Sequence, residues 1–476
     1  MKSTGGHHPP PTVSTQPLSL RWNFSWIAAG NAVEMGCQWG LLVVLAHLGN
    51  LEMIGTVVLA FAICAPVYAL ACLGLRSALV SDARREYQFG DYLALRLVTS
   101  TLALAAIVAL ALTGGYQTET VLIILAAGLG ELLKSISDIF HALLQQRERM
   151  DRIGVSLMLR GPLVLVLLGL GVYLTENILW AMLAFPLAAA FTLFCYDLPA
   201  GSRILRTAPA GNRGASVEPR ARDAGLKPRW HFPTLLRLAW LTLPLGGVLM
   251  LITLTASLPR YAVSYYLGNR ALGLFVSIYY LAMVGNKVVT AIGQSAGPRL
   301  AKYHAAGNTV AYVRLLGKLL GVTVGLGALL VATVALAGGP ILGLLYDADF
   351  APYQSLAVWL MLAGAMMHLT IPLGMAIEAT RRFKTHMILR AVGVLVLLAL
   401  LPQLIPTYNL QGAAVAMLIA FACTFAGCLG VVVWSVRDSR PSATEAEHSA
   451  PQQPARGRVP PPRWKRGAAR ERLKTP

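Results

Sequence analysis

The feature that most constrains this chain is a succession of apolar stretches, each about as long as a helix that crosses a membrane. Such a helix needs about 20 mostly apolar residues to span the hydrocarbon core of a bilayer. The sequence predicts twelve of them, at roughly 24–46, 54–75, 92–112, 120–144, 154–174, 177–197, 233–257, 271–292, 312–337, 354–378, 386–405 and 410–434. We therefore predict an all-α, polytopic membrane protein with about 12 transmembrane helices in two six-helix bundles.

The composition excludes two other classes of protein. Only 13% of the residues are charged and the mean hydropathy is +0.60, whereas a soluble domain carries about 25% charged residues. So few charges cannot cover a water-soluble particle of 476 residues, which excludes a soluble globular enzyme. The abundance of Leu, Val, Ala and Ile excludes a disordered chain. None of the six cysteines forms a CxxC motif, and no Cys/His cluster has metal-ligand spacing, so we predict no metal site.

The basic residues predict the orientation in the membrane. The formal net charge is +19, and most Lys and Arg fall in the connectors that are cytoplasmic if the N-terminus is cytoplasmic. The opposite connectors contain only Arg260 and Arg270. Cytoplasmic loops carry the excess of Lys and Arg, so this distribution predicts that both termini are cytoplasmic. The basic surface is then expected to contact anionic membrane lipids rather than nucleic acid.

Two polar, Arg-rich segments predict the domain organisation. One lies between the sixth and seventh spans, and the other follows the last span. Their Pro, Gly, Ala and Arg content is typical of disordered segments. We predict a cytoplasmic N-terminal segment, an N-terminal six-helix bundle, a basic cytoplasmic linker, a C-terminal six-helix bundle and a disordered basic tail, at residues 1–23, 24–197, 198–232, 233–437 and 438–476.

The two halves share a short motif. Leu48-Gly49-Asn50 ends the first span and precedes Gly55, while Leu267-Gly268-Asn269 ends the seventh span and precedes Gly273. Two parallel six-helix repeats are a transporter architecture, in which the substrate path runs between the halves. The alternative is that Gly-Asn turns recur by chance between hydrophobic helices.

Several ionisable residues lie inside the predicted spans. Such residues are costly in lipid and usually face a bundle interior or a hydrated cavity. Glu34 lies in the first span, Arg160 in the fifth and Lys287 in the eighth, each without an opposite charge one turn away on its own helix. Glu131, Lys134 and Asp138 share one face of the fourth span, where they either line the cavity or neutralise one another.

Basic residues in such a cavity indicate a phosphate or diphosphate ligand, because Arg binds phosphate through a bidentate fork and Lys as a point charge. Neighbouring Tyr and Asn side chains suit sugar hydroxyls. The predicted substrate-binding residues are Lys134, Arg160, Arg260, Tyr280, Asn286, Lys287 and Gln294. The candidates for ion coupling are Glu34, Glu131 and Asp138, with the alternative that Glu34 pairs with Arg160 or Lys287.

The sequence contains no catalytic motif. It has no Walker A, GxSxG or HExxH pattern, so we predict no catalytic residues, no cofactor and no enzyme activity. Asp347 and Asp349 form a DxD-like pair, but it lies on a short outer connector and is interpreted as a solvated turn.

Longer motifs carry a resemblance to a known family. In the second half they are Arg260-Tyr261, Ser264-Tyr265-Tyr266-Leu267-Gly268, Ala271-Leu272-Gly273, Tyr279-Tyr280-Leu281 and Gly293-Gln294-Ser295-Ala296-Gly297-Pro298-Arg299-Leu300-Ala301. In the first half they are Ala65-Pro66, Leu73-Gly74-Leu75-Arg76 and Arg160-Gly161. Over most of residues 20–435 the chain resembles Wzx-type polysaccharide flippases, of the multidrug/oligosaccharidyl-lipid/polysaccharide exporter (MOP) superfamily. Where that family often has an acidic residue before the Arg-Tyr pair, this chain has Pro259.

The resemblance implies a flippase of the bacterial inner membrane. It would move undecaprenyl-diphosphate-linked oligosaccharide units by alternating access, for O-antigen, capsule or exopolysaccharide synthesis. Its expected partners are the lipid-linked oligosaccharide, a polysaccharide polymerase and a chain-length regulator. Two alternatives stay open. A drug/cation antiporter of the same superfamily would use the acidic residues, and a membrane polymerase or ligase would need a larger outer loop than the connector at 338–353.

Overall fold

The computed structural model describes residues 20–82, 86–206, 227–346, 348–380 and 382–438, and every regular element in these ranges is helical. Ten of these helices are long and apolar enough to cross a membrane. Two of them, Phe232–Thr290 and Lys384–Arg437, have 59 and 54 residues, about twice the length that one crossing needs. Each contains one non-helical residue, Gly268 or Asn409, with positive φ. Counted as two crossings each, they bring the total to the twelve that the sequence predicts.

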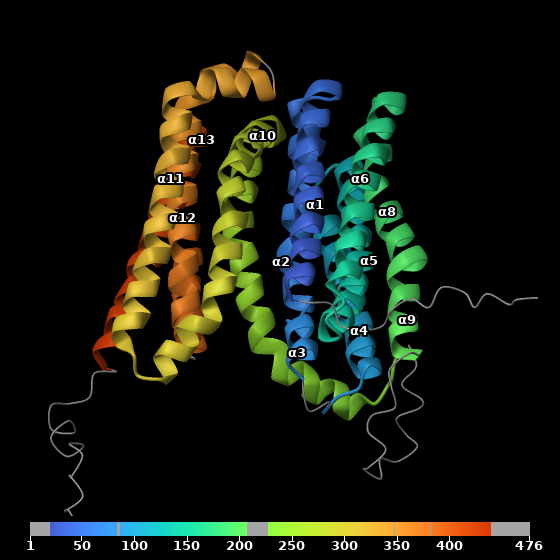
Figure 1. Ribbon diagram of the computed structural model, residues 1–476. Coiled ribbons are helices and arrows are strands. Elements are labelled where there is room, and N and C mark those ends of the chain that lie inside the picture. The colour runs from blue at the N-terminus through green and yellow to red at the C-terminus, as the bar shows by residue number, and fades with distance from the viewer. Residues whose placement is uncertain (1–19, 83–85, 207–226, 347, 381, 439–476) are drawn as a thin grey trace, which may run out of the picture.

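The first half of the chain forms one bundle (Figure 1). Its first five crossings are built from α1 (Leu20–Leu48), α2 (Leu51–Ala71), α3 (Leu75–Ser81), α4 (Phe89–Thr113), α5 (Thr118–Gln146) and α6 (Met150–Thr175). The sixth crossing is divided into α7 (Ile178–Met182), α8 (Ala184–Thr192), the π-helix η1 (Leu193–Asp197) and α9 (Leu198–Arg206).

The second half forms the other bundle, and α10 connects it to the first. Its elements are α10 (Phe232–Ala305), α11 (Thr309–Leu345), the short 3-10 helix η3 (Ala348–Tyr353), α12 (Gln354–Ala379) and α13 (Phe383–Asp438). Figure 1 shows α10 running along the first bundle, turning, and returning beside α11 and α12. The predicted fold class, an all-α membrane protein with two six-helix bundles, is confirmed.

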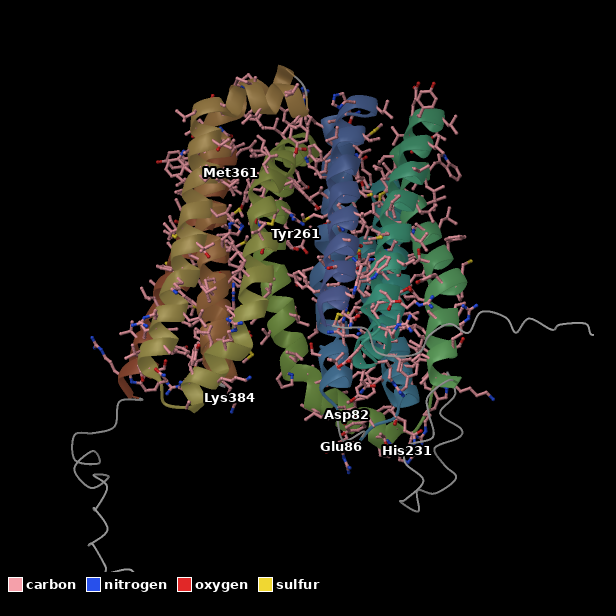
Figure 2. The ribbon with its side chains drawn as sticks, viewed as in Figure 1. Asp82, Glu86, His231, Tyr261, Met361 and Lys384 are labelled. Carbon is pink, nitrogen blue, oxygen red and sulfur yellow. The ribbon has the colours of Figure 1, made fainter. Side chains whose placement is uncertain are left out.

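The turns between helices lie at two ends of the molecule. Asp82, Glu86, His231 and Lys384 lie at the same end (Figure 2), which the sequence predicts to be cytoplasmic and which we call the inner end. The opposite end contains the turn between α1 and α2 and the reversal of α10 at Gly268. We call it the outer end. The orientation itself stays a prediction.

Several predicted boundaries differ by a few residues, since α1 begins at Leu20 and α13 ends at Asp438, and the largest difference is in the linker. The first nine residues of the predicted linker, Leu198–Arg206, form helix α9. They are helical because this segment packs on the bundle: Ala200 is buried and Gly201 approaches the ring of Phe140 on α5. Residues 1–19, 207–226 and 439–476 lie outside the described residues, as does Asp347 of the DxD-like pair, so the predicted terminal segments and most of the linker stay predictions.

Helix α2 packs against α10 more extensively than any other pair of described elements pack, and the approach is closest at the outer end. A Cβ atom on Gly55 would lie 1.8 Å from the carbonyl oxygen of Asn269, and one on Gly273 would lie 2.0 Å from that of Leu51. Only glycine fits at either position. These glycines follow the two repeated Leu-Gly-Asn motifs, which occupy corresponding turns, and Asn50 accepts a hydrogen bond from Met53 N to cap α2.

Replacing Gly55 with Ala is expected to force α2 and α10 apart. Overpacking of this kind costs about 1–3 kcal/mol of folding free energy, so the purified variant should melt several degrees below wild type. Gly36→Ala is the matched control, because a Cβ at Gly36 of α1 meets nothing within 4 Å. Equal melting temperatures for the two variants would contradict the close contact.

Candidate functional site

A cavity of about 260 Å³ lies between the two halves. Its walls come from α1, α2, α5, α6 and α8 of the first half and from both arms of α10. Apolar side chains such as Val57, Phe61 and Val276 form part of the surface. The polar and charged residues that line it are Glu34, Gln38, Glu131, Lys134, Arg160, Arg260 and Tyr280. Ionisable side chains at this depth are expensive, which identifies the cavity as a candidate functional site.

The close packing of α1 on α6 brings Glu34 and Arg160 together. A Cβ on Gly154 would lie 2.5 Å from the carbonyl oxygen of Trp26, and one on Gly161 would lie 3.1 Å from the Cα of Glu34. At this short helix-to-helix distance the Arg160 Nη2 atom donates to Glu34 Oε1 over 2.5 Å. Arg160 is only 8% exposed. The sequence leaves open whether Glu34 carries a proton or pairs with Arg160 or Lys287, and the structure pairs it with Arg160.

Helix α5 contributes a second pair of opposite charges. Lys134 Nζ donates to Glu131 Oε1 over 3.1 Å, one turn apart on the helix. The Lys134 side chain is 45% exposed, so it can exchange Glu131 for another anion.

Arg260 reaches the cavity from the first arm of α10, opposite the residues of α1, α5 and α6. Its Nε atom is buried and has no hydrogen-bond partner among the described residues. Buried guanidinium nitrogens are normally satisfied, so an unpaired one in a cavity wall indicates a position where a ligand binds. Tyr280, on the second arm, adds a hydroxyl to the same wall.

The cavity therefore has three cationic side chains and two carboxylates. Two of the cations, Arg160 and Lys134, are paired with carboxylates, and Arg260 supplies the excess charge. In a medium of low dielectric constant this arrangement favours an anionic group that accepts hydrogen bonds from a guanidinium fork.

Asp138 does not pair with Lys134, so the alternative in which Glu131, Lys134 and Asp138 neutralise one another holds only for Glu131 and Lys134. Asp138 accepts hydrogen bonds from Arg76 Nη1 of α3 at 3.0 Å and Arg96 Nη2 of α4 at 3.2 Å. Arg96 is fully buried and needs an anionic partner more than the exposed Lys134 does. Asp138 is not among the residues that line the cavity. The sequence signal for this pairing was an arginine inside the predicted span 92–112.

The remaining predicted ligands lie on the second arm of α10. Asn286 accepts a hydrogen bond from Thr290 Oγ1 at 3.1 Å and is not among the lining residues. The side chains of Lys287 and Gln294 lie outside the described part of the structure, so their placement in the cavity stays a prediction.

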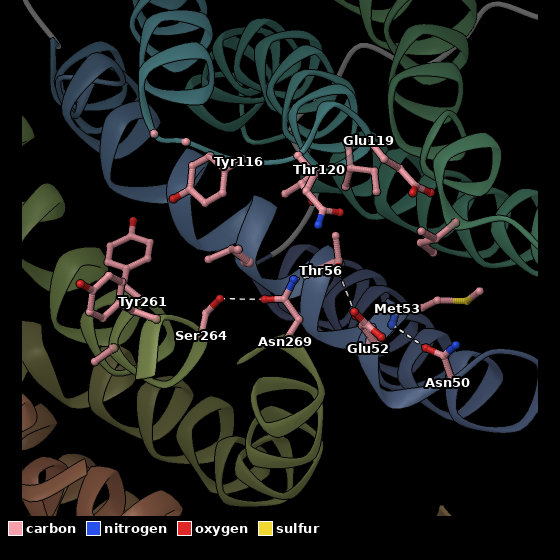
Figure 3. Close-up of a pocket in the computed structure, with 18 of the residues that line it drawn as sticks. Asn50, Glu52, Met53, Thr56, Tyr116, Glu119, Thr120, Tyr261, Ser264 and Asn269 are labelled. Carbon is pink, nitrogen blue, oxygen red and sulfur yellow. Dashed lines mark hydrogen bonds between the residues drawn. The ribbon is translucent and has the colours of Figure 1, made fainter. Parts of the chain in front are cut away.

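A larger cavity, of about 910 Å³, lies at the outer end, and we call it the outer vestibule (Figure 3). It is bordered by the outer ends of α2, α5 and α10, by the turns 114–117 and 176–177, and by residues 398–402 of α13. Three glutamates, Glu52, Glu119 and Glu176, line it. The sequence alone does not predict this cavity, although each predicted outer turn of the first half carries one of these acidic residues.

Comparison with known proteins gives one curated relative. No family model matches the chain. The capsular polysaccharide biosynthesis protein CapF of Staphylococcus aureus is 24% identical over 400 residues, which cover 84% of this chain and 95% of CapF.

Solved structures identify the fold. An inward-facing multidrug resistance MATE family transporter of the MOP superfamily superposes with a TM-score of 0.65 at 13% identity, covering 89% of this chain and 100% of the other. The chain has the fold of the MOP superfamily. A MOP superfamily transporter from Pyrococcus furiosus, described as having a binding pocket of reversed polarity, gives 0.58 at 13% identity and covers 88% of this chain and 95% of its own. The resemblance stated from the sequence is confirmed by the CapF relative and by the MOP fold.

The Glu34–Arg160 pair is expected to contribute to stability as a unit. Arg160→Ala removes one partner of a largely buried pair, which typically costs about 3–5 kcal/mol. The double variant Glu34→Ala/Arg160→Ala should therefore be more stable than Arg160→Ala alone, because it leaves no buried carboxylate without its guanidinium. Thermal unfolding of the purified proteins in detergent measures both. A double variant less stable than the single one by the full cost of Glu34→Ala would show that the two residues are not coupled.

Proposed function

We propose that this MOP-fold protein is an exporter that moves undecaprenyl-diphosphate-linked oligosaccharide units across the bacterial inner membrane, without enzymatic activity. The fold and the polysaccharide-biosynthesis name of the relative support a membrane exporter. The finer assignment is supported above all by one observation: Lys134, Arg160 and Arg260, from both halves, line one cavity, and Arg260 has an unpaired buried nitrogen.

The diphosphate is the part of this cargo that the membrane core opposes most. It carries charge, and its transfer from water into hydrocarbon without compensation costs many kcal/mol. In the proposed complex Arg260 donates to the phosphate oxygens through its guanidinium fork. Lys134 and Arg160 strengthen the positive potential, and the polyprenyl tail stays in the surrounding lipid.

The contact at the outer end fits one state of an alternating-access cycle. There α2 and α10 approach so closely that Gly55 and Gly273 admit no side chain. Asn269 Nδ2 also donates to Thr56 Oγ1 over 3.1 Å, and Tyr261 OH donates to the carbonyl oxygen of Ala62. In the proposed cycle these contacts break when the halves rock apart at the outer end, so that the cavity opens outward.

The proposed orientation and partners are those that the sequence predicts. Both termini would be cytoplasmic, the basic inner surface would contact anionic lipids, and the exported units would pass to a polymerase with a chain-length regulator. Ion coupling would use Glu34 or Glu131, the two carboxylates of the cavity. For Asp138, which Arg76 and Arg96 already neutralise, we propose a structural role.

Substitution of the cavity cations is expected to reduce export. Arg260→Ala should lower polymer export by about tenfold or more, since loss of one charge-assisted contact to the ligand costs about 1.5–3 kcal/mol. Lys134→Ala should have a smaller effect, because Glu131 is its partner in the empty cavity. The measurement is surface polymer in a strain that lacks its own exporter, with membrane protein levels equalised.

Arg270→Ala is the matched control for this experiment, because Arg270 is an exposed cation ten residues further along α10 and does not line the cavity. It should leave export unchanged. Undiminished export by the Arg260→Ala/Lys134→Ala double variant would remove the cavity from the transport mechanism.

The second candidate function is a proton-coupled antiporter of cationic drugs, which Glu34 and Glu131 in the cavity wall favour. It predicts that a proton gradient drives ethidium efflux from proteoliposomes, and that Glu34→Gln abolishes this efflux. The exporter predicts no ethidium transport above that of empty liposomes, because Arg260 and Lys134 repel a cation. Gradient-driven efflux that needs Glu34 would replace the exporter assignment.

A further inference from the structure

We propose that the outer vestibule is a binding subsite for the sugar part of the cargo, selective for neutral or cationic sugars over anionic ones. This inference rests on the proposed function and adds to it the place and the charge preference of saccharide binding. The volume of about 910 Å³ lies within the range of about 300–1,000 Å³ that is typical of ligand-binding pockets.

Both halves build the vestibule, so its shape depends on their relative position. The first half supplies the N-terminal turn of α2 and the turns that precede α5 and α7, while the second half supplies the reversal of α10 and part of α13. Figure 3 shows Tyr116 and Thr120 on one side of the space and Tyr261 and Ser264 on another. A ligand in the vestibule therefore contacts both halves as long as they are closed at the outer end.

The polar lining suits a polyol. Amide side chains offer a donor and an acceptor together, and tyrosine rings offer an apolar face with a hydroxyl at its edge. A sugar ring needs both kinds of contact, because it presents hydroxyls at its rim and C–H groups on its faces. The lining residues of these two types are Gln117, Tyr116 and Tyr265, together with Asn50, Asn177, Asn269 and Tyr261, which already make hydrogen bonds within the protein. Tyr265 is 83% exposed, so its ring face is available to a ligand.

The charge of the vestibule is opposite to that of the inner cavity. Glu52, Glu119 and Glu176 are exposed, and no ion pair within the described part of the chain involves them. None of the lining residues is Lys or Arg. Three uncompensated carboxylates repel a diphosphate and attract amino sugars. The vestibule thus accepts the saccharide and excludes the phosphate-bearing end.

A thin layer of contacts separates the vestibule from the cationic cavity. Ser264 Oγ donates to Asn269 Oδ1 over 2.7 Å, and Asn269 Nδ2 donates to Thr56 Oγ1 over 3.1 Å (Figure 3). Thr56 and Tyr261 line the vestibule, while the adjacent Val57 and Arg260 line the inner cavity. When this layer opens, the two cavities become continuous. A saccharide in the vestibule can then extend its linkage to a diphosphate that lies in the cationic cavity.

The test uses the full chain in spheroplasts, with Thr120→Cys as a reporter inside the vestibule. The probes are the membrane-impermeant thiol reagents MTSET, which is cationic, and MTSES, which is anionic. The ligand is a lipid-free oligosaccharide released by mild hydrolysis from the surface polymer of the source organism. At about ten times its Kd the oligosaccharide should slow labelling of the reporter about tenfold. Unmodified chain serves as the blank for its own cysteines, and Tyr353→Cys, which is exposed but does not line the vestibule, is the control reporter.

Two variants address the two chemical claims. Tyr116→Ala/Tyr265→Ala, in the reporter background, should weaken protection by the oligosaccharide about tenfold, as expected for loss of two aromatic contacts. Glu52→Gln/Glu119→Gln/Glu176→Gln should lower the ratio of MTSET to MTSES labelling rates by about three- to tenfold, because the carboxylates no longer concentrate the cationic reagent. At the Tyr353→Cys reporter the three Gln substitutions should leave the ratio of labelling rates unchanged.

Unslowed labelling at the solubility limit of the oligosaccharide, or protection that survives removal of both tyrosines, would overturn the subsite. An unchanged reagent ratio in the triple Gln variant would overturn the charge preference. The probe has neither lipid nor diphosphate, so these outcomes are independent of transport. A chain that binds the free saccharide but fails to export polymer would contradict the proposed function and leave the subsite in place.

Discussion

The contact between α2 and α10 is the constraint on which the rest of the structure depends. Gly55 and Gly273 allow the backbones of the two halves to approach within van der Waals distance at the outer end. Their closure sets the position of Arg260 opposite Glu34 and Arg160, and it separates the inner cavity from the outer vestibule. Because small-residue contacts between membrane helices rely on close backbone packing and not on the hydrophobic effect, they can form and break with modest free-energy changes. That property suits a contact that must open in each transport cycle.

The two cavities divide the chemistry of an amphiphilic cargo between them. The inner one is cationic and of moderate size, whereas the outer one is acidic, larger, and rich in amides and tyrosines. This change of sign along the path stabilises an anionic linkage group in the inner cavity and disfavours it in the outer vestibule. Glu34 and Glu131 neutralise Arg160 and Lys134, so the cost of burying these cations is reduced.

The sequence predicts the fold well and the site only in part. The length of each apolar stretch and the Gly-Asn turns between stretches are properties of the local sequence. The twelve crossings and the two bundles can therefore be predicted from the sequence. Contacts between different helices cannot be read from the sequence, because the pattern of one helix shows which side chains share a face but not which helix packs against that face. The sequence offers Lys134 as a partner for Asp138 on its own helix, although Arg96 of α4 is its partner. It also leaves Glu34 with either Arg160 or Lys287 as a possible partner, and only the structure shows the pair with Arg160. The outer vestibule needed the turns of both halves to be placed together.

Recognition of a diphosphate by the cavity between the halves is the central requirement of the proposed transport. Native mass spectrometry of the purified protein with undecaprenyl diphosphate and with undecaprenol, at equal concentrations, measures this recognition. We predict that the diphosphate lipid stays bound at collision energies that remove undecaprenol, and that Arg260→Ala/Lys134→Ala abolishes the difference while Arg270→Ala preserves it. Equal retention of the two lipids by the wild-type protein would contradict the account.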